Sequence, residues 1–348
     1  PWGKDDDLLA YAIAQVGGSG THGHEYIVVN GNLNATAALV LSGYSYTKPI
    51  TVRPLVMDGT QRIAYDGGAV KFQNATNISG INTYFVDFSN MVTTGTFFDC
   101  NGRSNIVGCS FDGTGKLSGN YLDVGGSSVV MGSHFYNDER TGSGLFIYLN
   151  SGSMALGNFF DNITRHAYDL YTKGSEFRNN VLTYDSGYTY NTGSILSIDS
   201  GKIDNNTFIG PGAGGGTAAA ACIYVPNSYE VNHIANNYFE GFSLCINVST
   251  SSTHPYLINQ LVGNRYHNCT NFVEGGAPSD SIILNEENEE LSSTGLVDIS
   301  SADYRPNNLL INQGYDPFAM VNAITNTVRP TVGAIENRIA APRVRDLY

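Results

Sequence analysis

The sequence predicts an all-β protein that folds as a parallel β-solenoid of about nine to ten coils, and three observations support this. A short phrase, apolar-x-x-Asn/Ser-x-aromatic, returns along the chain, as in "VMGSHF", "IANNYF" and "LVGNRY". The phrase recurs at intervals near 25 residues. It follows an alternating strand-like stretch and a turn of small residues each time, as in "NYLDVGGSS" and "LFIYLNSGS".

The spacing of the phrase decides between repeat architectures. Successive gaps between its closing residues are 24, 25, 22, 26, 31 and 27. An apolar pattern with the 3.6-residue period of helical repeats is absent. A β-sandwich or propeller with Asn-rich hairpins is the alternative, but it needs antiparallel pairing or blades of fixed length. The closing residues are Phe111, Phe135, Phe160, Leu182, Phe208, Phe239 and Tyr266.

The Asn of the phrase has a structural reason. Asn tolerates left-handed backbone and bonds to nearby backbone groups, so it suits a turn between two strands. In a solenoid the Asn residues of successive coils lie above one another and share side-chain amide bonds, as in cross-β stacks. The aromatic residue after the Asn should point inward and stack on its counterparts, for example Phe135 on Phe160.

Composition narrows the functional classes. The chain of 348 residues has 40 Gly, only 14% charged residues and a net charge of −13. A protein this acidic repels phosphate backbones, so we expect no nucleic-acid partner. The chain contains no run of 18 apolar residues, which is the length that a membrane-spanning helix needs. We therefore expect no membrane insertion.

The cysteine pattern predicts no zinc or haem site, since no CxxC is present among the five cysteines. We expect no cofactor, with Ca²⁺ as the one ion that a carboxylate site would suit. Aligning the coils places Cys222, Cys245 and Cys269 at one level. Two of these cysteines could form a disulfide, but a stack of reduced thiols fits the alignment equally well.

The two ends of the chain do not follow the 25-residue repeat. Residues 1–20 contain "DDDLLAYAIAQV", which reads as an amphipathic helix with three Asp at its start, and we expect it to cap the first coil. Residues 21–275 form the predicted solenoid. Residues 276–348 are more charged, and we expect an irregular C-terminal extension that folds back over the last coil or leads to another module.

The coils resemble right-handed parallel β-helix proteins of the pectate-lyase-like group. "NLNATAALVLSGYSYTKPITVRPL" is similar to the first coil of its chondroitinase and alginate-lyase branch. "DYRPNNLLINQGYDP" followed by "RPTVGAIEN" is similar to the closing segment of secreted and phage-encoded members. The resemblance implies a single-stranded right-handed β-helix, and it implies an extracellular or virion-surface location. It identifies a fold better than a function.

Catalytic motifs of this group are missing, including Arg-x-Pro-x-x-Arg and the aspartate pair of polygalacturonases. Lys173 and Lys202 are expected in turns. The densest ionisable groups are Asp138 and Glu139 in one loop and a second set that starts at Arg165. If the chain is an enzyme, these ionisable groups would be the catalytic residues of a glycosidase or lyase. The alternative is that they have no catalytic role, the first set lying in a solvated loop and the second at the start of an ordinary coil. The candidate catalytic residues are Asp138, Glu139, Arg165, His166 and Asp169.

A second candidate site follows from strand alternation, which sends the residue before each inward strand position outward. Acids, hydroxyls, an amide and two aromatic rings would then form one outer stripe, a surface that suits sugar rings, although any polar sheet face gives a similar pattern. The stripe residues are Asp123, Tyr148, Asp169, Ser197, Tyr224 and Asn247.

We therefore expect a non-catalytic extracellular or virion-surface protein, an appendage, fibre or adhesin module that contacts a polysaccharide or cell-surface glycan. A polysaccharide-degrading lyase or glycosidase is the alternative. An ice-binding face would need flat Thr ladders at a fixed spacing, and the variable period argues against it. A homo-oligomer, either a trimer or an end-to-end filament, would suit this fold.

Overall fold

The structure is a computed structural model, and it describes part of the chain. The described residues are 25–29, 33–34, 39–40, 50–66, 72–73, 81–89, 94–100, 103–139, 146–150, 152–163, 170–184, 194–213, 221–225, 232–248, 258–275, 282–299, 303–307 and 309–310.

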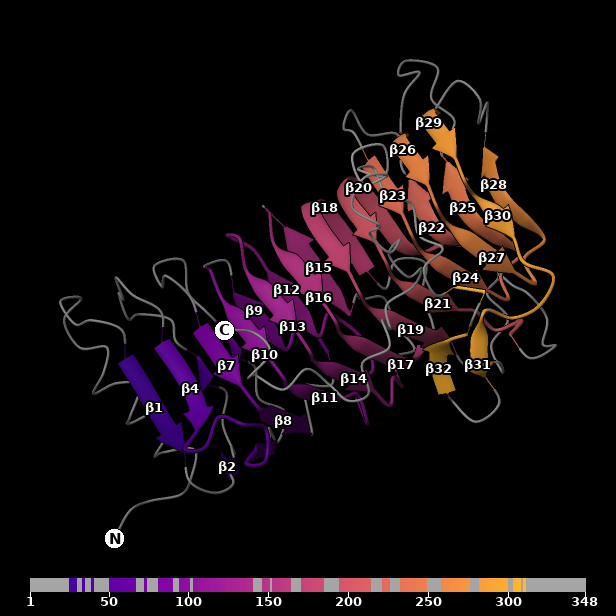
Figure 1. Cartoon of the computed structure of the whole chain (residues 1–348). Helices are drawn as coiled ribbons and strands as arrows, with labels where there is room; N and C mark the ends of the chain where they lie inside the picture. Colours follow the sequence, from indigo (N-terminus) through magenta and orange to yellow (C-terminus); the bar gives the residue numbers. More distant parts are fainter. Residues whose placement is uncertain are drawn as a thin grey trace, which may run out of the picture. The chain divides into compact units, whose positions relative to one another are not determined.

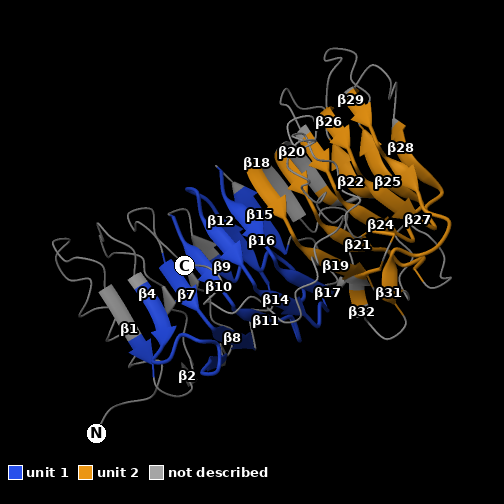
Figure 2. Cartoon of the chain, in the orientation of Figure 1, with its two compact units in different colours: residues 1–165, 340–348 blue, residues 166–339 orange. Residues whose placement is uncertain are grey.

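The chain divides into two compact units, which Figure 2 colours separately. Unit 1 comprises residues 1–165 and 340–348, and unit 2 comprises residues 166–339. Each unit is built from the same solenoid turn. The chain passes through a strand of row 1, a turn of small residues, a strand of row 2, a sharp corner, and a strand of row 3. Strands within each row pair in parallel with those of the next turn.

The strands of unit 1 follow one another along each row in Figure 1. Row 1 contains β3 (Leu39–Val40), β6 (Phe72–Gln73), β9 (Phe98–Cys100), β12 (Leu122–Val124) and β15 (Ile147–Asn150). Row 2 contains β1 (Glu25–Val29), β4 (Ile50–Pro54), β7 (Ile81–Tyr84), β10 (Asn105–Val107), β13 (Val129–Met131) and β16 (Met154–Leu156). Row 3 contains β2 (Leu33–Asn34), β5 (Ile63–Asp66), β8 (Val86–Ser89), β11 (Ser110–Asp112), β14 (His134–Tyr136) and β17 (Phe159–Ile163).

Unit 2 repeats this plan, but its first two strands each run through both row 1 and row 2. These are β18 (Leu170–Arg178) and β20 (Ser194–Asp204), which pair with register shifts around Lys173. Row 1 continues with β22 (Ala221–Val225), β25 (Leu244–Val248) and β28 (Asn271–Gly275). Row 2 continues with β23 (Asn232–Ala235), β26 (Ile258–Val262) and β29 (Ile282–Glu286). Row 3 contains β19 (Val181–Tyr184), β21 (Thr207–Ile209), β24 (Tyr238–Glu240), β27 (Arg265–His267) and β30 (Glu289–Glu290).

The interior of each unit contains the predicted aromatic column. In unit 1, Phe111, Phe135 and Phe160 are fully buried, and neighbouring ring centroids lie 4.7 Å apart with nearly parallel planes. In unit 2, Phe208 stacks on Phe239 with centroids 5.1 Å apart. These distances match the spacing of paired strands, so the column follows directly from in-register stacking.

The corner between rows 2 and 3 explains the Asn phrase. Its first residue has a positive φ, for example Gly132 (57°) in unit 1 and Asn236 (55°) in unit 2. This left-handed conformation favours Gly and Asn, which occupy the position just before the Asn/Ser of the phrase in these turns. The Asn/Ser of the phrase is the second corner residue.

The second corner residue of unit 2 builds an asparagine ladder. Asn237 shows the pattern: its backbone N–H and Nδ2 donate to Oδ1 of Asn264 at 3.0 Å each, while Nδ2 also donates to the carbonyl oxygen of Ile203 at 2.9 Å. The first four amides of the ladder are fully buried, so their hydrogen bonds satisfy polar groups that water cannot reach, whereas Asn288 at its end is partly exposed. The ladder contains Asn180, Asn206, Asn237, Asn264 and Asn288.

Hydroxyl groups form a related ladder in unit 1, at the turn between rows 1 and 2. The backbone N–H of Ser104 donates to Oγ of Ser128 at 2.9 Å, and the N–H of Ser128 donates to Oγ of Ser153 at 3.2 Å. All three serines are fully buried. Small polar residues at this turn are therefore required by the stacking.

The C-terminal part differs from the expected boundary. Strands β29 and β30 pair with β26 and β27, so the repeat continues past residue 275 to Glu290. The chain then forms an antiparallel pair, β31 (Leu296–Asp298) and β32 (Asp303–Pro306). We call residues 291–310 the cover segment, of which 300–302 and 308 lie outside the described residues.

The cover segment packs on the outer side of row 3 in unit 2. Leu291, Leu296 and Leu310 form one buried apolar cluster with Ile209 and Tyr238. Tyr238 Oη accepts a 2.8 Å hydrogen bond from the N–H of Gly295. The extension therefore folds back over a strand face.

The all-β class and the parallel β-solenoid are confirmed, with about six turns traced. No helix occurs among the residues that the structure describes. The predicted capping helix falls in residues 1–20, outside that part. The count of nine to ten coils stays a prediction, because the two units are described separately.

Candidate functional site

The predicted outer stripe lies in row 1, and the register tests its alignment. In unit 1, Asp123 pairs with Tyr148, and both side chains are half-buried. In unit 2, Ser197 pairs with Tyr224, which pairs with Asn247. Glu274, missed in the sequence, extends the stripe by one turn and is exposed.

One member of the stripe needs correction. The residue that pairs with Ser197 is Tyr171, whereas the sequence alignment put Asp169 at this level. Asp169 itself lies outside the described residues. The sequence alignment matched Leu170 with Ile198, whereas the register pairs Leu170 with Leu196, two residues earlier. Strand alternation has a period of two, so it does not distinguish these two alignments.

The predicted catalytic loop is only partly described. Asp138 is 3% exposed, and its Oδ1 accepts a 3.2 Å hydrogen bond from Tyr121 Oη. Glu139 is exposed, and its Oε2 accepts a 2.9 Å hydrogen bond from the N–H of Gly115. Both carboxylates thus hold the loop after β14. The other candidates, Arg165, His166 and Asp169, lie outside the described residues, so their catalytic role stays a prediction.

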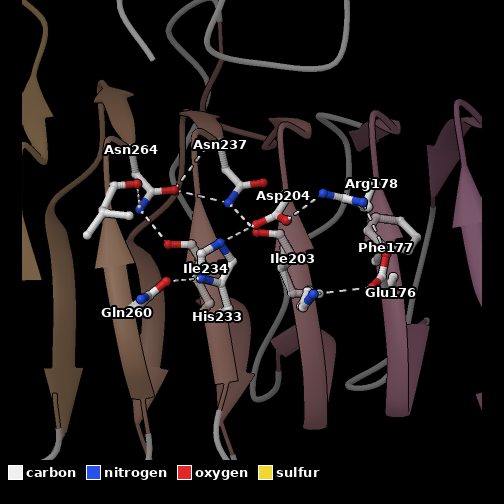
Figure 3. Close-up of polar contacts among 12 residues, drawn as sticks. Glu176, Phe177, Arg178, Ile203, Asp204, His233, Ile234, Asn237, Gln260 and Asn264 are labelled. Carbon is white, nitrogen blue, oxygen red and sulfur yellow. Dashed lines mark hydrogen bonds and ion pairs between the residues drawn. The ribbon is translucent and has the colours of Figure 1, made fainter. Parts of the chain in front are cut away.

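A connected group of charged side chains in unit 2 lies elsewhere, on the outer face of row 2 (Figure 3). We call it the ionic cluster. It was not recognised in the sequence as a site, because its members come from four separate turns. The cluster comprises Glu176, Arg178, Lys202, Asp204, His233 and Gln260.

Strand register positions these side chains in two columns. Glu176, Lys202, His233 and Gln260 occupy paired positions on β18, β20, β23 and β26. Arg178 and Asp204 form the second column, two residues further along. Lys202 therefore lies within a strand, and the expectation of a turn was wrong. The strand continues there because Gly201 adopts a φ of 146°, a conformation that L-residues with side chains rarely adopt.

The charges of the cluster alternate. Glu176 contacts both Arg178 (3.2 Å) and Lys202 (3.5 Å). Asp204 contacts Arg178 at 3.3 Å and Nε2 of His233 at 2.9 Å. Nδ1 of His233 lies 2.6 Å from Oε1 of Gln260, which completes the chain in Figure 3.

Exposure within the cluster is graded. The Asp204 side chain is 13% exposed, whereas Arg178 is 42% and Lys202 is 54% exposed. The two cationic heads are therefore partly exposed, and the Asp204 carboxylate, which lies between Arg178 and His233, is mostly covered. Exposed ion pairs contribute little to stability. The ion pairs of Arg178 and Lys202 could therefore be exchanged for contacts with a ligand at little cost in stability.

Rigid packing supports the cluster from inside. The inward neighbours Phe177, Ile203 and Ile234 are fully buried. Their backbone oxygens accept hydrogen bonds from the asparagine ladder, with Nδ2 of Asn206, Asn237 and Asn264 as donors. The strands that present the charges are thereby fixed on both sides.

The pKa of His233 is raised above its ordinary value. Burial lowers it, but the contact with Asp204, its negative charge and the hydrogen bond with Gln260 together raise it by more. The folded state thus favours the imidazolium form. The cluster offers the guanidinium of Arg178, the ammonium of Lys202, one imidazole and one amide. Such a set of groups can bind hydroxyl or carboxylate groups.

Cys109, Cys222, Cys245 and Cys269 are free thiols. Cys222 and Cys245 are fully buried, and Cys269 is partly exposed. Strand register puts Phe272 beside Cys245, so Cys269 precedes the level that the sequence alignment gave it. Burial raises the pKa of the Cys222 and Cys245 thiols, which makes them small core residues rather than nucleophiles.

Neither a metal-binding group nor a membrane-spanning helix occurs among the described residues. No group of three or more His, Cys, Asp or Glu side chains there is placed to hold a metal ion. Nor does that part of the chain contain a helix of the length and hydrophobicity that a membrane crossing needs.

Comparisons of the chain with protein families, with curated proteins and with solved structures find no match. The fold and the outer faces together define the class as a parallel β-solenoid protein.

Proposed function

We propose that this chain is a non-catalytic surface protein, an extracellular or virion appendage or adhesin module, that contacts glycans through the row 1 stripe. The observation that carries the proposal is the in-register column of Tyr224, Asn247 and Glu274 in unit 2, with Asp123 and Tyr148 equivalent in unit 1. Aromatic rings beside hydrogen-bonding groups suit the apolar faces and hydroxyls of sugars.

The interior supports a surface role. Continuous ladders of buried amides and hydroxyls satisfy the corners, and parallel pairing satisfies the strands. A backbone bonded in this way opens rarely, which protects it from proteases outside the cell. Assembly as a trimer or filament, a right-handed coil and a relation to the pectate-lyase-like group belong to the same proposal, and the sequence resemblance supports them.

Glycan-array binding of the full chain tests the proposal. We expect wild-type protein to bind at least one polysaccharide or cell-surface glycan, and the double variant Tyr148→Ala/Tyr224→Ala to lose part of that binding. Thermal unfolding of the variant should match wild type, since both rings are half-exposed. If no glycan binds, or if the double variant binds like wild type to every glycan, the proposal falls.

A polysaccharide-degrading lyase or glycosidase is the second candidate. The observation that favours it is the ionic cluster, in which a carboxylate and an imidazole lie 2.9 Å apart beside Arg178 and Lys202. Such a pair can transfer protons at a sugar ring. Incubation with uronate and neutral polysaccharides would detect shortened chains. Depolymerisation that disappears in both His233→Ala and Asp204→Asn would establish the enzyme and overturn the first proposal.

A further inference from the structure

The outer face of row 3 in unit 1 presents three ring side chains together, which we call the aromatic ridge: His134, Tyr136 and Phe159. His134 and Phe159 are paired positions of β14 and β17, with ring centroids 5.0 Å apart and planes 13° apart. Tyr136 lies two residues along β14, with its ring centroid 4.9 Å from that of His134. All three side chains are partly exposed.

The ridge has an apolar centre. Burial lowers the pKa of His134, so its ring is neutral near pH 7. Its Nε2 is enclosed and has no hydrogen-bond partner in the described structure. The imidazole thus packs between its neighbours as an aromatic spacer. Three contiguous rings at outward positions are unusual on a surface that is otherwise rich in Asn, Ser and Thr.

Polar groups border the ridge on its N-terminal side. Ser110 pairs with His134 and donates from Oγ to Oδ1 of Asp87 at 2.5 Å. Arg62 contacts the same carboxylate through two donors: Nε lies 2.9 and 2.8 Å from its two oxygens, and Nη2 lies 2.5 Å from Oδ1. Asp112 pairs with Tyr136, and its Oδ1 accepts a 2.7 Å bond from Thr114 Oγ1.

The charge of this face selects among ligands. In the row 3 strands β8, β11, β14 and β17 the charged residues are all acidic: Asp87, Asp112 and Asp161. The nearby Arg62 is already paired with Asp87. An anionic ligand would therefore be repelled, whereas a neutral ligand with hydroxyl groups could donate to the carboxylates.

We propose that the aromatic ridge and its acidic border form a second glycan site, distinct from the row 1 stripe, that takes a neutral oligosaccharide. The inference rests on the proposed function, which makes the chain a glycan-contacting protein. The partly exposed ring stack supplies an apolar surface for the apolar side of a sugar, and the aspartates accept hydrogen bonds from its hydroxyls. Spacings of about 4.8 Å across turns and about 7 Å along a strand give the site the footprint of a short oligosaccharide.

The test measures the Kd of the full chain for soluble neutral oligosaccharides of glucose, galactose and mannose, and for uronate oligosaccharides of equal length. We expect at least one neutral series to bind. We expect Tyr136→Ala and Phe159→Ala each to raise its Kd about tenfold, the loss of one good aromatic contact. Val297→Ala, an exposed residue of the cover segment that belongs to neither proposed surface, is the control and should leave this Kd unchanged. If Tyr136→Ala unfolds, Tyr136→Leu keeps the apolar bulk without a ring face and should show the same loss.

The outcomes separate the two proposals. If neutral oligosaccharides bind but depend on Tyr224 and not on Tyr136 or Phe159, the ridge proposal falls and the stripe proposal stands. Binding of uronates alone overturns the ridge proposal in the same way. If no glycan of any kind binds, both proposals fall.

Discussion

At the residue scale, single side chains do identifiable work in the corners of the solenoid. Asn237 illustrates this, since its amide connects the turns before and after it and also bonds to a strand carbonyl. The amide is fully buried, so no water can replace a lost bond.

Replacing Asn237 by Ala should lower the free energy of unfolding by about 3 kcal/mol, because buried groups of Asn206 and Ile203 lose their partner. Urea denaturation measures the effect. Asn247→Ala, on a half-buried outward position, is the control and should cost no more than about 0.5 kcal/mol. If the two variants lose the same free energy of unfolding, the ladder contributes no more to stability than an outward-facing amide does.

The raised pKa of His233 predicts a pH dependence. A group with a raised folded-state pKa stabilises the protein below its unfolded pKa, about 6.5, and this stabilisation is lost as pH rises through the folded pKa. We therefore expect the urea midpoint of wild type to exceed that of His233→Gln at about pH 5.5, and the difference to shrink by about pH 8.5. A difference that stays constant across this range would contradict the ion pair with Asp204.

At the element scale, long strands and special glycines set the register. Strand β20 crosses from row 1 to row 2 at Gly201, whose added Cβ would lie 2.1 Å from the carbonyl oxygen of Ser175. Gly157 also has a positive φ, but a Cβ there meets no atom within 4 Å.

Gly201→Ala should therefore destabilise the chain more than Gly157→Ala does. The second substitution costs only the left-handed backbone of Ala, about 1–2 kcal/mol. The first adds an overlap with backbone that no side-chain movement can relieve. Comparing the thermal midpoints of the two variants checks this, and a smaller loss for Gly201→Ala would refute the assigned backbone path.

The cover segment is an element whose attachment can be tested separately. Leu296 is 1% exposed within it, whereas its neighbour Val297 is 51% exposed. We expect Leu296→Ala to speed amide hydrogen exchange at Gly295, Asn307 and Leu310, whose N–H groups are bonded within or beneath the segment. Exchange in β24 should change little, because its bonds run to neighbouring turns. In the control Val297→Ala, these amides should exchange at the wild-type rate. Faster exchange in that control would contradict the packing of the cover segment on row 3 through Leu296.

At the scale of the whole molecule, the sequence predicted the repeat well and the surface chemistry poorly. Repeated phrases located the interior column and the corners, because the left-handed position favours Gly and Asn and the interior favours large apolar side chains. Outer faces carry no such constraint. Glu176, Arg178 and Asp204 come from turns 26 residues apart, and no residue type in the repeat indicates which outward positions will meet.

The central claim is that successive turns place like residues over like, since every proposed site depends on it. Paired cysteines test it directly. In-register neighbours lie about 4.8 Å apart, within disulfide reach, whereas residues offset by two lie beyond about 7 Å. We predict that Asp123→Cys/Tyr148→Cys forms a disulfide under mild oxidation, seen by mass spectrometry, and that Asp123→Cys/Asn150→Cys does not. A bridge in the offset pair and none in the aligned pair would contradict the account.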